Sequence, residues 1–302
     1  MNGNQSTFAP LGPQADLLYG MTWLLGTGAA TIFLVTMGLL ALALFGSAEW
    51  RRRLASPRAI VLCGAVVPAV VLTALLLHSL GVANALARIS GTPLVVEVIG
   101  RQFWWEVRDP AQGVVTANEI RLPVGRQVEL RVSSPDVIHS LWIPALHGKI
   151  DLIPGRENRL LVTAGQPGVM RGQCAEFCGA QHTLMALFAV AEPQADFSVW
   201  IERQRAPSVP DGEGPRLFAS AGCGACHTIR GTGFAGRLGP DLTLIGTRHS
   251  LGAGTLENHR ETLAQWIASP QAIKPGNAMP DFRGVLSEAE IGVLAAWLAA
   301  LQ

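Results

Sequence analysis

The residues best suited to redox chemistry form a run of twelve, Cys-Ala-Glu-Phe-Cys-Gly-Ala-Gln-His-Thr-Leu-Met, from residue 174 to residue 185. The run holds two thiols, Cys174 and Cys178, an imidazole, His182, and a thioether, Met185. Soft and borderline ligands of this kind suit copper. If a tight turn aims both cysteines inward, each thiolate can bridge a pair of copper ions, and such a pair passes single electrons with little change of geometry.

Two coppers need two terminal imidazoles, and His139 in the segment Asp-Val-Ile-His-Ser-Leu-Trp-Ile-Pro supplies the second. Met185 stands three residues after His182, where a weak axial ligand is expected. The cysteine and histidine spacing also fits part of a structural zinc site, and a lone methionine is usually core packing. The remote His139 and a second redox motif downstream favour copper.

That second motif is Cys223-Gly-Ala-Cys226-His227, which is typical of c-type haem attachment. Two thioether bonds to the haem vinyl groups need cysteines three residues apart, and the histidine that follows then reaches the iron. A zinc site is the alternative, but the C-terminal region holds only these two cysteines.

The other axial ligand follows by exclusion, because Met279 is the only methionine after the haem motif. Ligation by Met and His suits an electron carrier. His249 and His259 are the rival ligands. The carbonyl of Pro240 is a candidate acceptor for the ring N–H of His227, which would fix its tautomer.

The composition indicates a membrane protein of two or three domains. The chain has 302 residues, a net charge of +1 and only 15% charged residues, which gives no reason to expect a nucleic-acid partner. Hydrophobic residues make up 49%, and two segments, about 17–45 and 59–80, account for the excess. As helices they would be roughly 43 and 33 Å long, enough to span a bilayer, whereas two buried helices of a soluble core are the alternative.

Four arginines, at positions 51, 52, 53 and 58, lie between these segments and place the connecting loop on the cytoplasmic side. Both termini then lie on the opposite face. Pro68 predicts a kink in the second span. The first 16 residues lack the features of a signal peptide, so either the first span inserts with its N-terminus outside or a leader has been removed.

The rest of the chain changes from β-rich to helical. Residues 94–99, 119–123, 127–132 and 159–163 alternate at period two, which indicates a sandwich or barrel with both copper segments on loops at one end. Residues 193–205 favour a short amphipathic helix, and 206–215, with three prolines and two glycines, a linker. Helices are expected over 261–269 and 287–301. The predicted plan is therefore 1–91 with two transmembrane helices, a copper domain over 92–192, helix and linker over 193–215, and a haem domain over 216–302.

Three segments carry a family resemblance: His139-Ser-Leu-Trp-Ile-Pro, Lys149-Ile-Asp-Leu-Ile-Pro-Gly-Arg156 and the run 174–185. With the haem motif they closely resemble subunit II of haem-copper cytochrome c oxidases, in the form that carries a fused C-terminal cytochrome c. The resemblance covers essentially the whole chain. It implies a two-helix transmembrane hairpin, a cupredoxin-like β-barrel holding the binuclear copper centre CuA, and an all-α class I cytochrome c domain.

The resemblance also implies how the centre is ligated. Two thiolates would bridge the coppers, two imidazoles would be terminal ligands, and a thioether and a backbone carbonyl would be weak ligands; these are Cys174, Cys178, His139, His182, Met185 and Glu176. The family uses the side chain at the Glu176 position to bind a magnesium or manganese ion at the boundary with subunit I, and carboxylate oxygen suits such a cation. A solvated loop carboxylate is the alternative for Glu176.

Two departures from the family pattern bear on function. The aromatic run Gly-His-Gln-Trp-Tyr-Trp is Gly-Arg-Gln-Phe-Trp-Trp here, so the tryptophan through which external cytochrome c delivers electrons falls on Phe103. Trp104 and Trp105 are candidates either for electron transfer and contact with the membrane subunit or for packing. Val61 replaces a glutamate found near a proton-uptake entrance, which puts proton uptake through this subunit in doubt.

The resemblance implies a subunit that conducts electrons without carrying the oxygen chemistry. Electrons would pass from a cytochrome c donor through haem c and CuA to the catalytic subunit I, where O2 is reduced to water, and the linker would raise the effective concentration of haem near copper. The chain would act as an oxidoreductase and translocase subunit of a respiratory chain in the bacterial inner membrane. Its copper and haem domains would face the periplasm, and its partners would be the other oxidase subunits, the donor and the bilayer.

Three alternatives remain at this point. The same electron module could serve a CuA-type nitric oxide reductase. A non-catalytic copper-binding membrane protein, for trafficking or sensing, is disfavoured by the haem motif. A quinol oxidase subunit would keep the barrel without the cysteine pair, so Cys174 and Cys178 count against it.

Overall fold

The structure, a computed structural model, describes residues 3–302 and divides into two compact units. One unit is Asp16–Arg88. The other joins Ile89–Gln302 with the N-terminal residues 3–15. This segment was expected to belong with the transmembrane helices. It lies instead against the β-sheets, where Leu11 donates its N–H to the carbonyl of Ala145 (2.8 Å) and accepts from Gly165 (2.7 Å).

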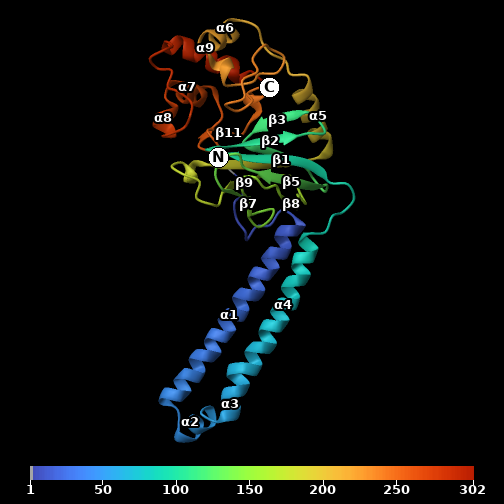
Figure 1. Cartoon of the computed structure of the whole chain (residues 1–302), viewed down its shortest axis with the longest axis vertical. Coiled ribbons are helices and arrows are strands. Elements are labelled where there is room, and N and C mark those ends of the chain that lie inside the picture. The colour runs from blue at the N-terminus through green and yellow to red at the C-terminus, as the bar shows by residue number, and fades with distance from the viewer. Residues whose placement is uncertain (1–2) are drawn as a thin grey trace. The chain divides into compact units, whose positions relative to one another are not determined.

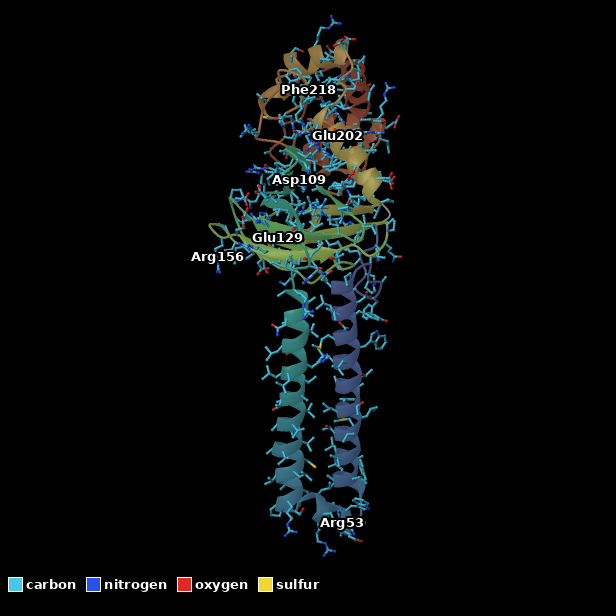
Figure 2. The ribbon with its side chains drawn as sticks, turned by 90° about the vertical axis from the view of Figure 1, so that its right-hand side faces the viewer. Arg53, Asp109, Glu129, Arg156, Glu202 and Phe218 are labelled. Carbon is cyan, nitrogen blue, oxygen red and sulfur yellow. The ribbon has the colours of Figure 1, made fainter. Side chains whose placement is uncertain are left out.

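The first unit is a hairpin of two long apolar helices. Helix α1 (Pro13–Phe45) is followed by the short helices α2 (Ala48–Leu54) and α3 (Pro57–Val61) and then by α4 (Val67–Leu86), as Figure 1 shows. The stretches Pro13–Phe45 and Pro57–Leu86 are long and apolar enough to cross a membrane. Arg53 lies at the connecting end of the hairpin (Figure 2), as the distribution of basic residues predicts.

The second helix of this hairpin is irregular before Pro68. A π-helical turn, Leu62–Val66, separates α3 from α4. A proline cannot donate the backbone hydrogen bond to the preceding turn, and a widened turn is a common way of accommodating that loss.

Two five-stranded sheets form the β domain (Figure 1). The order of the first is β3 (Val114–Ala117), β2 (Trp104–Asp109), β1 (Leu94–Arg101), β5 (Gln127–Ser133), β8 (Asn158–Thr163). The order of the second is β4 (Glu119–Pro123), β10 (Ala186–Glu192), β9 (Gly168–Cys174), β6 (His139–Trp142), β7 (Ile150–Leu152). The pairs β1–β5 and β4–β10 are parallel, and all other pairs within the two sheets are antiparallel.

One apolar core lies between the two sheets. Strand β1 alternates buried and half-buried residues along its whole length, as the period-two pattern predicts. Trp105, Leu130, Leu141 and Leu187 are fully buried in this core. The predicted cupredoxin-like β class is confirmed.

The second sheet departs from simple alternation at β10, where the run Ala-Leu-Phe-Ala-Val-Ala is buried throughout. Leu187 and Ala189 pack into the core between the sheets. Phe188 points the other way and stacks on His249 of the C-terminal domain, with ring centroids 6.1 Å apart. A strand covered on both faces becomes a continuous apolar run, which is why alternation alone does not reveal it.

Helix α5 (Gln194–Arg205) follows the sheets, in agreement with the expected amphipathic helix. The linker after it is shorter than predicted, because α6 (Glu213–Ser220) already includes Gly214 and Pro215. Proline is tolerated in the first turn of a helix, where its missing N–H would have no partner anyway. Trp297 also ties the linker down by donating its indole N–H to the Pro210 carbonyl (2.9 Å).

The C-terminal domain is a small helical bundle with a core of its own. Its remaining elements are the short strands β11 (Ser250–Leu251) and β12 (Leu256–Glu257) and the helices α7 (Arg260–Ala268), α8 (Pro270–Ile273) and α9 (Glu288–Ala299). Helix α9 begins with a capping box in which Ser287 and Glu290 each accept from the other's backbone N–H.

Helices α6 and α9 pack closely because α6 carries a glycine at the contact. A Cβ built on Gly214 would lie 2.3 Å from Cγ of Trp297. Beside this contact Phe218 meets the edge of Trp297, with ring centroids 5.5 Å apart, and Figure 2 places Phe218 among these helices. No side chain fits at position 214 without moving α9.

Gly214→Ala should therefore lower the free energy of unfolding of the C-terminal domain by about 1–3 kcal/mol, through overpacking against Trp297. Denaturant unfolding followed by haem absorbance measures the change. Gly284→Ala is the matched control, since nothing lies within 4 Å of a Cβ at that position. Equal stability of the two variants would contradict the close helix contact.

Candidate metal and haem sites

The two cysteines of the run 174–185 converge on one buried point. Cys174 ends β9 and Cys178 lies in the turn that follows, and their sulfur atoms are 3.8 Å apart. Both side chains are buried. Nδ1 of His139, at the start of β6, is 3.9 Å from the sulfur of Cys174. The metal-binding atoms of these three residues all lie within 4.8 Å of one another.

The remaining soft donors reach the second sulfur. Nδ1 of His182 lies 3.8 Å and the sulfur of Met185 lies 3.9 Å from the sulfur of Cys178. The backbone carbonyl oxygen of Glu176 lies 3.2 Å from the sulfur of Cys174. The structure thus brings together all six groups that the sequence proposes as copper ligands. Cys174 and His139 lie at the ends of strands, whereas the sequence predicts that both copper segments lie on loops between strands.

The short distance between the two sulfurs limits the negative charge that they can carry together. The hydrogen bond between the two sulfurs lowers the pKa of the Cys174 thiol to about 3 and raises the pKa of Cys178 above its ordinary value. A thiolate on Cys174 therefore disfavours a second negative charge on Cys178. A cation bound between the sulfurs would displace the second proton, because thiolates are the metal-binding form.

His139 is held by neighbours that sequence reasoning did not identify. Its Nε2 lies 2.9 Å from Oδ1 of Asp136, and the ring is fully buried beside Trp105, with ring centroids 6.1 Å apart. Burial lowers the pKa of His139, but its hydrogen bonds to Cys174 and Asp136 outweigh this, and the pKa is raised. A Cβ on Gly100 would lie 2.9 Å from Cδ2 of the ring, so the glycine of the aromatic run is needed here.

The three aromatic candidates have different surroundings. Trp105 is fully buried in the core, which excludes it from any contact surface with another subunit. Trp104 is half-buried, with the Arg101 guanidinium 5.9 Å from its ring centroid. Phe103 is half-buried against the core, and its backbone carbonyl accepts a hydrogen bond from Lys274 of the C-terminal domain.

The side chain of Glu176 points away from the sulfur pair. It is nearly half exposed and lies 3.7 Å from the ammonium group of Lys149. Its neighbour Phe177 is 75% exposed.

The haem motif forms a compact turn in the C-terminal domain. Gly222 adopts a left-handed conformation (φ 75°), and the 3-10 turn Cys223–Ala225 follows it. Nδ1 of His227 donates to the carbonyl of Pro240 (2.7 Å), which is the acceptor that the sequence suggests. Burial lowers the pKa of His227, so the ring is neutral and its Nε2 is available to a metal. A Cβ on Gly239 would lie 2.5 Å from this ring.

The three candidates for the second haem ligand, Met279, His249 and His259, have different surroundings. Met279 packs against the domain core, and Gln271 donates to its carbonyl (2.9 Å). Nδ1 of His249 interacts with the Glu119 carboxylate (2.9 Å) on the β domain. His259 caps α7 and contacts Glu261 (3.0 Å).

Both donor sets fit the groups that the sequence implies. Two thiols, two imidazoles and a thioether around one buried point are a soft set that suits copper. In the C-terminal domain, the buried Nε atoms of Arg230 and Arg248 have no hydrogen-bond partner among the described residues. The charge of Arg248 also acts on His227. A buried cation near His227 fits an acidic prosthetic group such as haem, whose propionates are carboxylates.

Both domains match known families. Residues 109–191 match the model described as "Cytochrome C oxidase subunit II, periplasmic domain", and residues 212–302 match "Cytochrome c". The first of these families implies a CuA centre in the β domain, and the second indicates a haem c in the C-terminal domain.

The chain resembles curated proteins named cytochrome c oxidase subunit 2. The protein from Alkalihalophilus pseudofirmus (strain ATCC BAA-2126 / JCM 17055 / OF4) is 31% identical, over 99% of this chain and 91% of that protein. The one from Bacillus subtilis (strain 168) is 32% identical, over 69% of this chain and 62% of that protein. A solved structure, the periplasmic domain of subunit II of cytochrome oxidase (CoxB) of Bradyrhizobium japonicum, is 28% identical, over 39% of this chain and 97% of that chain, with a TM-score of 0.38.

The alignment with the Alkalihalophilus protein covers 99% of this chain, so it extends over the two apolar helices, the β domain and the C-terminal domain. The chain therefore belongs to the cytochrome c oxidase subunit 2 family, as a membrane-anchored subunit of an oxidoreductase that carries a C-terminal cytochrome c domain.

Proposed function

We propose that this chain is the subunit through which electrons enter a terminal oxidase. Electrons pass from a cytochrome c donor to the C-terminal domain, then to the copper domain, and then to a haem-copper catalytic subunit that reduces O2 to water. When bound, haem c and CuA supply one-electron redox chemistry with little structural change. The observation that carries the proposal is the sulfur pair 3.8 Å apart with an imidazole Nδ1 beside each sulfur.

In this proposal the residues around the sulfur pair have separate roles. Cys174 and Cys178 would hold the two coppers as thiolates, with any thiol proton released to solvent as the metal binds. His139 and His182 would bind through the Nδ1 atoms that face the sulfurs. Met185 and the carbonyl of Glu176 would be weak ligands.

Asp136 orients one of these ligands. Its carboxylate accepts a hydrogen bond from the Nε2–H group of His139 (2.9 Å). This favours the neutral tautomer in which Nδ1 carries no proton and faces Cys174. Gln102 and Val137 donate their backbone N–H groups to the same carboxylate, at 2.8 and 2.6 Å. Partners of this kind fix the tautomer and the ring orientation of a metal-binding histidine.

In the C-terminal domain Cys223 and Cys226 would form the thioether bonds to haem, and His227 would bind its iron, with Pro240 fixing the tautomer of the ring. Met279 would be the second iron ligand. His249 and His259 are less suited, because the first is engaged with the β domain and the second caps a helix.

The location and further partners complete the proposal. The β domain and the C-terminal domain lie on the periplasmic face of a bacterial inner membrane, with the arginine-rich turn in the cytoplasm. The catalytic subunit I contacts the copper domain. The half-exposed Glu176 carboxylate is a ligand for magnesium or manganese at that boundary. The copper domain extends over 92–192, and the haem domain, expected over 216–302, begins at Glu213 because α6 belongs to it.

Asp136→Ala should lower copper affinity about 10–100-fold, because His139 loses the acceptor that fixes its tautomer. Copper retention during titration with a chelator measures the effect. Glu157→Ala, which removes an exposed carboxylate of the same domain, is the control and should retain copper as the wild type does. Unchanged retention in Asp136→Ala would refute the orienting role.

Met185→Leu should keep both coppers while raising the reduction potential, because a thioether donor to the oxidised metal is lost. The electron-transfer rate should change with it. Copper content, spin resonance and redox titration together test this. Met170→Leu is the control, since Met170 is fully buried in the same core away from the proposed ligands. Identical spectra, potential and rate in wild type and Met185→Leu would remove Met185 from the ligand set.

Cys223→Ala combined with Cys226→Ala should abolish covalent haem while the copper signal persists. Reduction of copper by the donor should then slow strongly. Haem absorbance after denaturation and stopped-flow copper reduction give the two readings. Cys63→Ala, which removes a cysteine of the second membrane helix, should change neither. Undiminished turnover without haem would show that the C-terminal domain is not on the required electron path.

A further inference from the structure

A buried lysine joins the two soluble domains beside the copper loop. Lys274 follows α8, five residues before Met279, and is only 3% exposed. Its ammonium group donates to the backbone carbonyl of Phe103 in the β domain (2.7 Å). It also donates to the carbonyl of Gly252 in its own domain (3.2 Å). One side chain thus spans the boundary between the domains.

A second contact crosses the same boundary in the opposite direction. Gln181, in the copper loop immediately before His182, is 1% exposed. Its side-chain N–H2 group donates to the carbonyls of Lys274 (3.2 Å) and Pro275 (2.5 Å). The short segment 274–275 is therefore hydrogen-bonded to both the aromatic run and the copper loop.

Packing alone does not account for a lysine at this position. Both acceptors of its ammonium group are neutral carbonyls, and within residues 3–302 no carboxylate lies within 4.0 Å of it. Burial lowers the pKa of Lys274 to about 7, so the protein bears a desolvation cost here. An apolar side chain would avoid that cost, but it would not define where the C-terminal domain sits on the β domain. Directional hydrogen bonds favour one docked arrangement of the two domains.

A separate set of contacts supports the docking along β10. His249 lies against the Glu119 carboxylate and stacks on Phe188 of β10. The N–H of Ala186, the residue after Met185, donates to the carbonyl of Ala253 (2.8 Å). These contacts hold the domains together along β10, and the contacts of Lys274 and Gln181 extend the docking to Phe103 and to the copper loop before His182.

We propose that Lys274 is a positioning residue that, with Gln181, fixes the haem domain against the copper loop in the geometry used for internal electron transfer. The inference rests on the electron relay proposed above. It assigns Lys274 no part in binding either cofactor. Its effect is on the fraction of molecules in which the two domains are docked at this edge.

The test compares Lys274→Met with Arg283→Met in the complete, cofactor-loaded oxidase complex. Each variant removes one cation from the C-terminal domain, but Arg283 is exposed and has no side-chain contact with the β domain among the described residues. Hydrogen exchange followed by mass spectrometry reports docking in peptides covering residues 100–105 and 179–182. Rapid mixing or flash reduction reports the rate from haem to copper.

Lys274→Met should leave the haem and copper spectra unchanged and speed exchange in both peptides. It should slow internal electron transfer on the order of tenfold, since the loss of a hydrogen bond between the domains changes a docking equilibrium by about that factor. Arg283→Met should match the wild type in all three readings. Unchanged exchange in Lys274→Met overturns the docking contact. Faster exchange with an unchanged rate overturns the positioning role.

A second variant covers the case in which Lys274→Met does not retain haem. Gln181→Leu breaks the contact from the copper side and leaves the C-terminal domain intact, with copper content checked because His182 is adjacent. Faster exchange in peptides covering 270–277 together with a slower rate supports the proposal, and wild-type behaviour overturns it. A wild-type complex without internal electron transfer would refute the relay itself, while the exchange data would still report on docking.

Discussion

The unit that contains the β domain and the C-terminal domain must hold two cysteine sulfurs 3.8 Å apart in a buried site, and the structure around them depends on this requirement. A thiolate on one sulfur disfavours a second negative charge on the other, and a bound cation would relieve that repulsion. Keeping them together requires a rigid support. The ends of β6 and β9 in one sheet provide it, since their register pairs Leu141 with Cys174.

The same constraint extends to neighbours that carry no metal chemistry. Gly100 leaves room for the ring of His139, and Asp136 holds the far nitrogen of that ring. In the C-terminal domain, Gly239 leaves room for His227 and Pro240 holds its Nδ1. His139 and His227 thus each have a glycine that leaves room for the ring and an oxygen that orients it, although the two domains share no fold.

Strand β10 connects the copper site to the second domain. Its Leu187 and Ala189 belong to the core of the sandwich, while Ala186 and Phe188 meet the C-terminal domain. The continuous apolar run of this strand indicates that both of its faces are covered. A search for alternating apolar and polar residues does not detect such a strand. The same reasoning located β1, β4, β5 and β8. It named no strand at β2, β3, β6, β7 or β9, and of these β6 and β9 are short or interrupted by glycine and carry proposed ligands at their ends.

The sequence by itself determined the chemistry: two apolar spans, an inward set of thiol, imidazole and thioether groups, and a haem attachment motif. These are local patterns, because residue type and short spacing set metal preference, helix length and thioether bonding. Only the tertiary structure determined which residues, distant in the sequence, hold the proposed ligands and the two domains in place. Gly100 leaves room for the ring of His139 only because their two strands lie close together in the fold, and Lys274 meets Phe103 only when two domains dock. Such contacts join positions as far as 171 residues apart, and no local pattern encodes them, because they depend on how separately folded surfaces fit together.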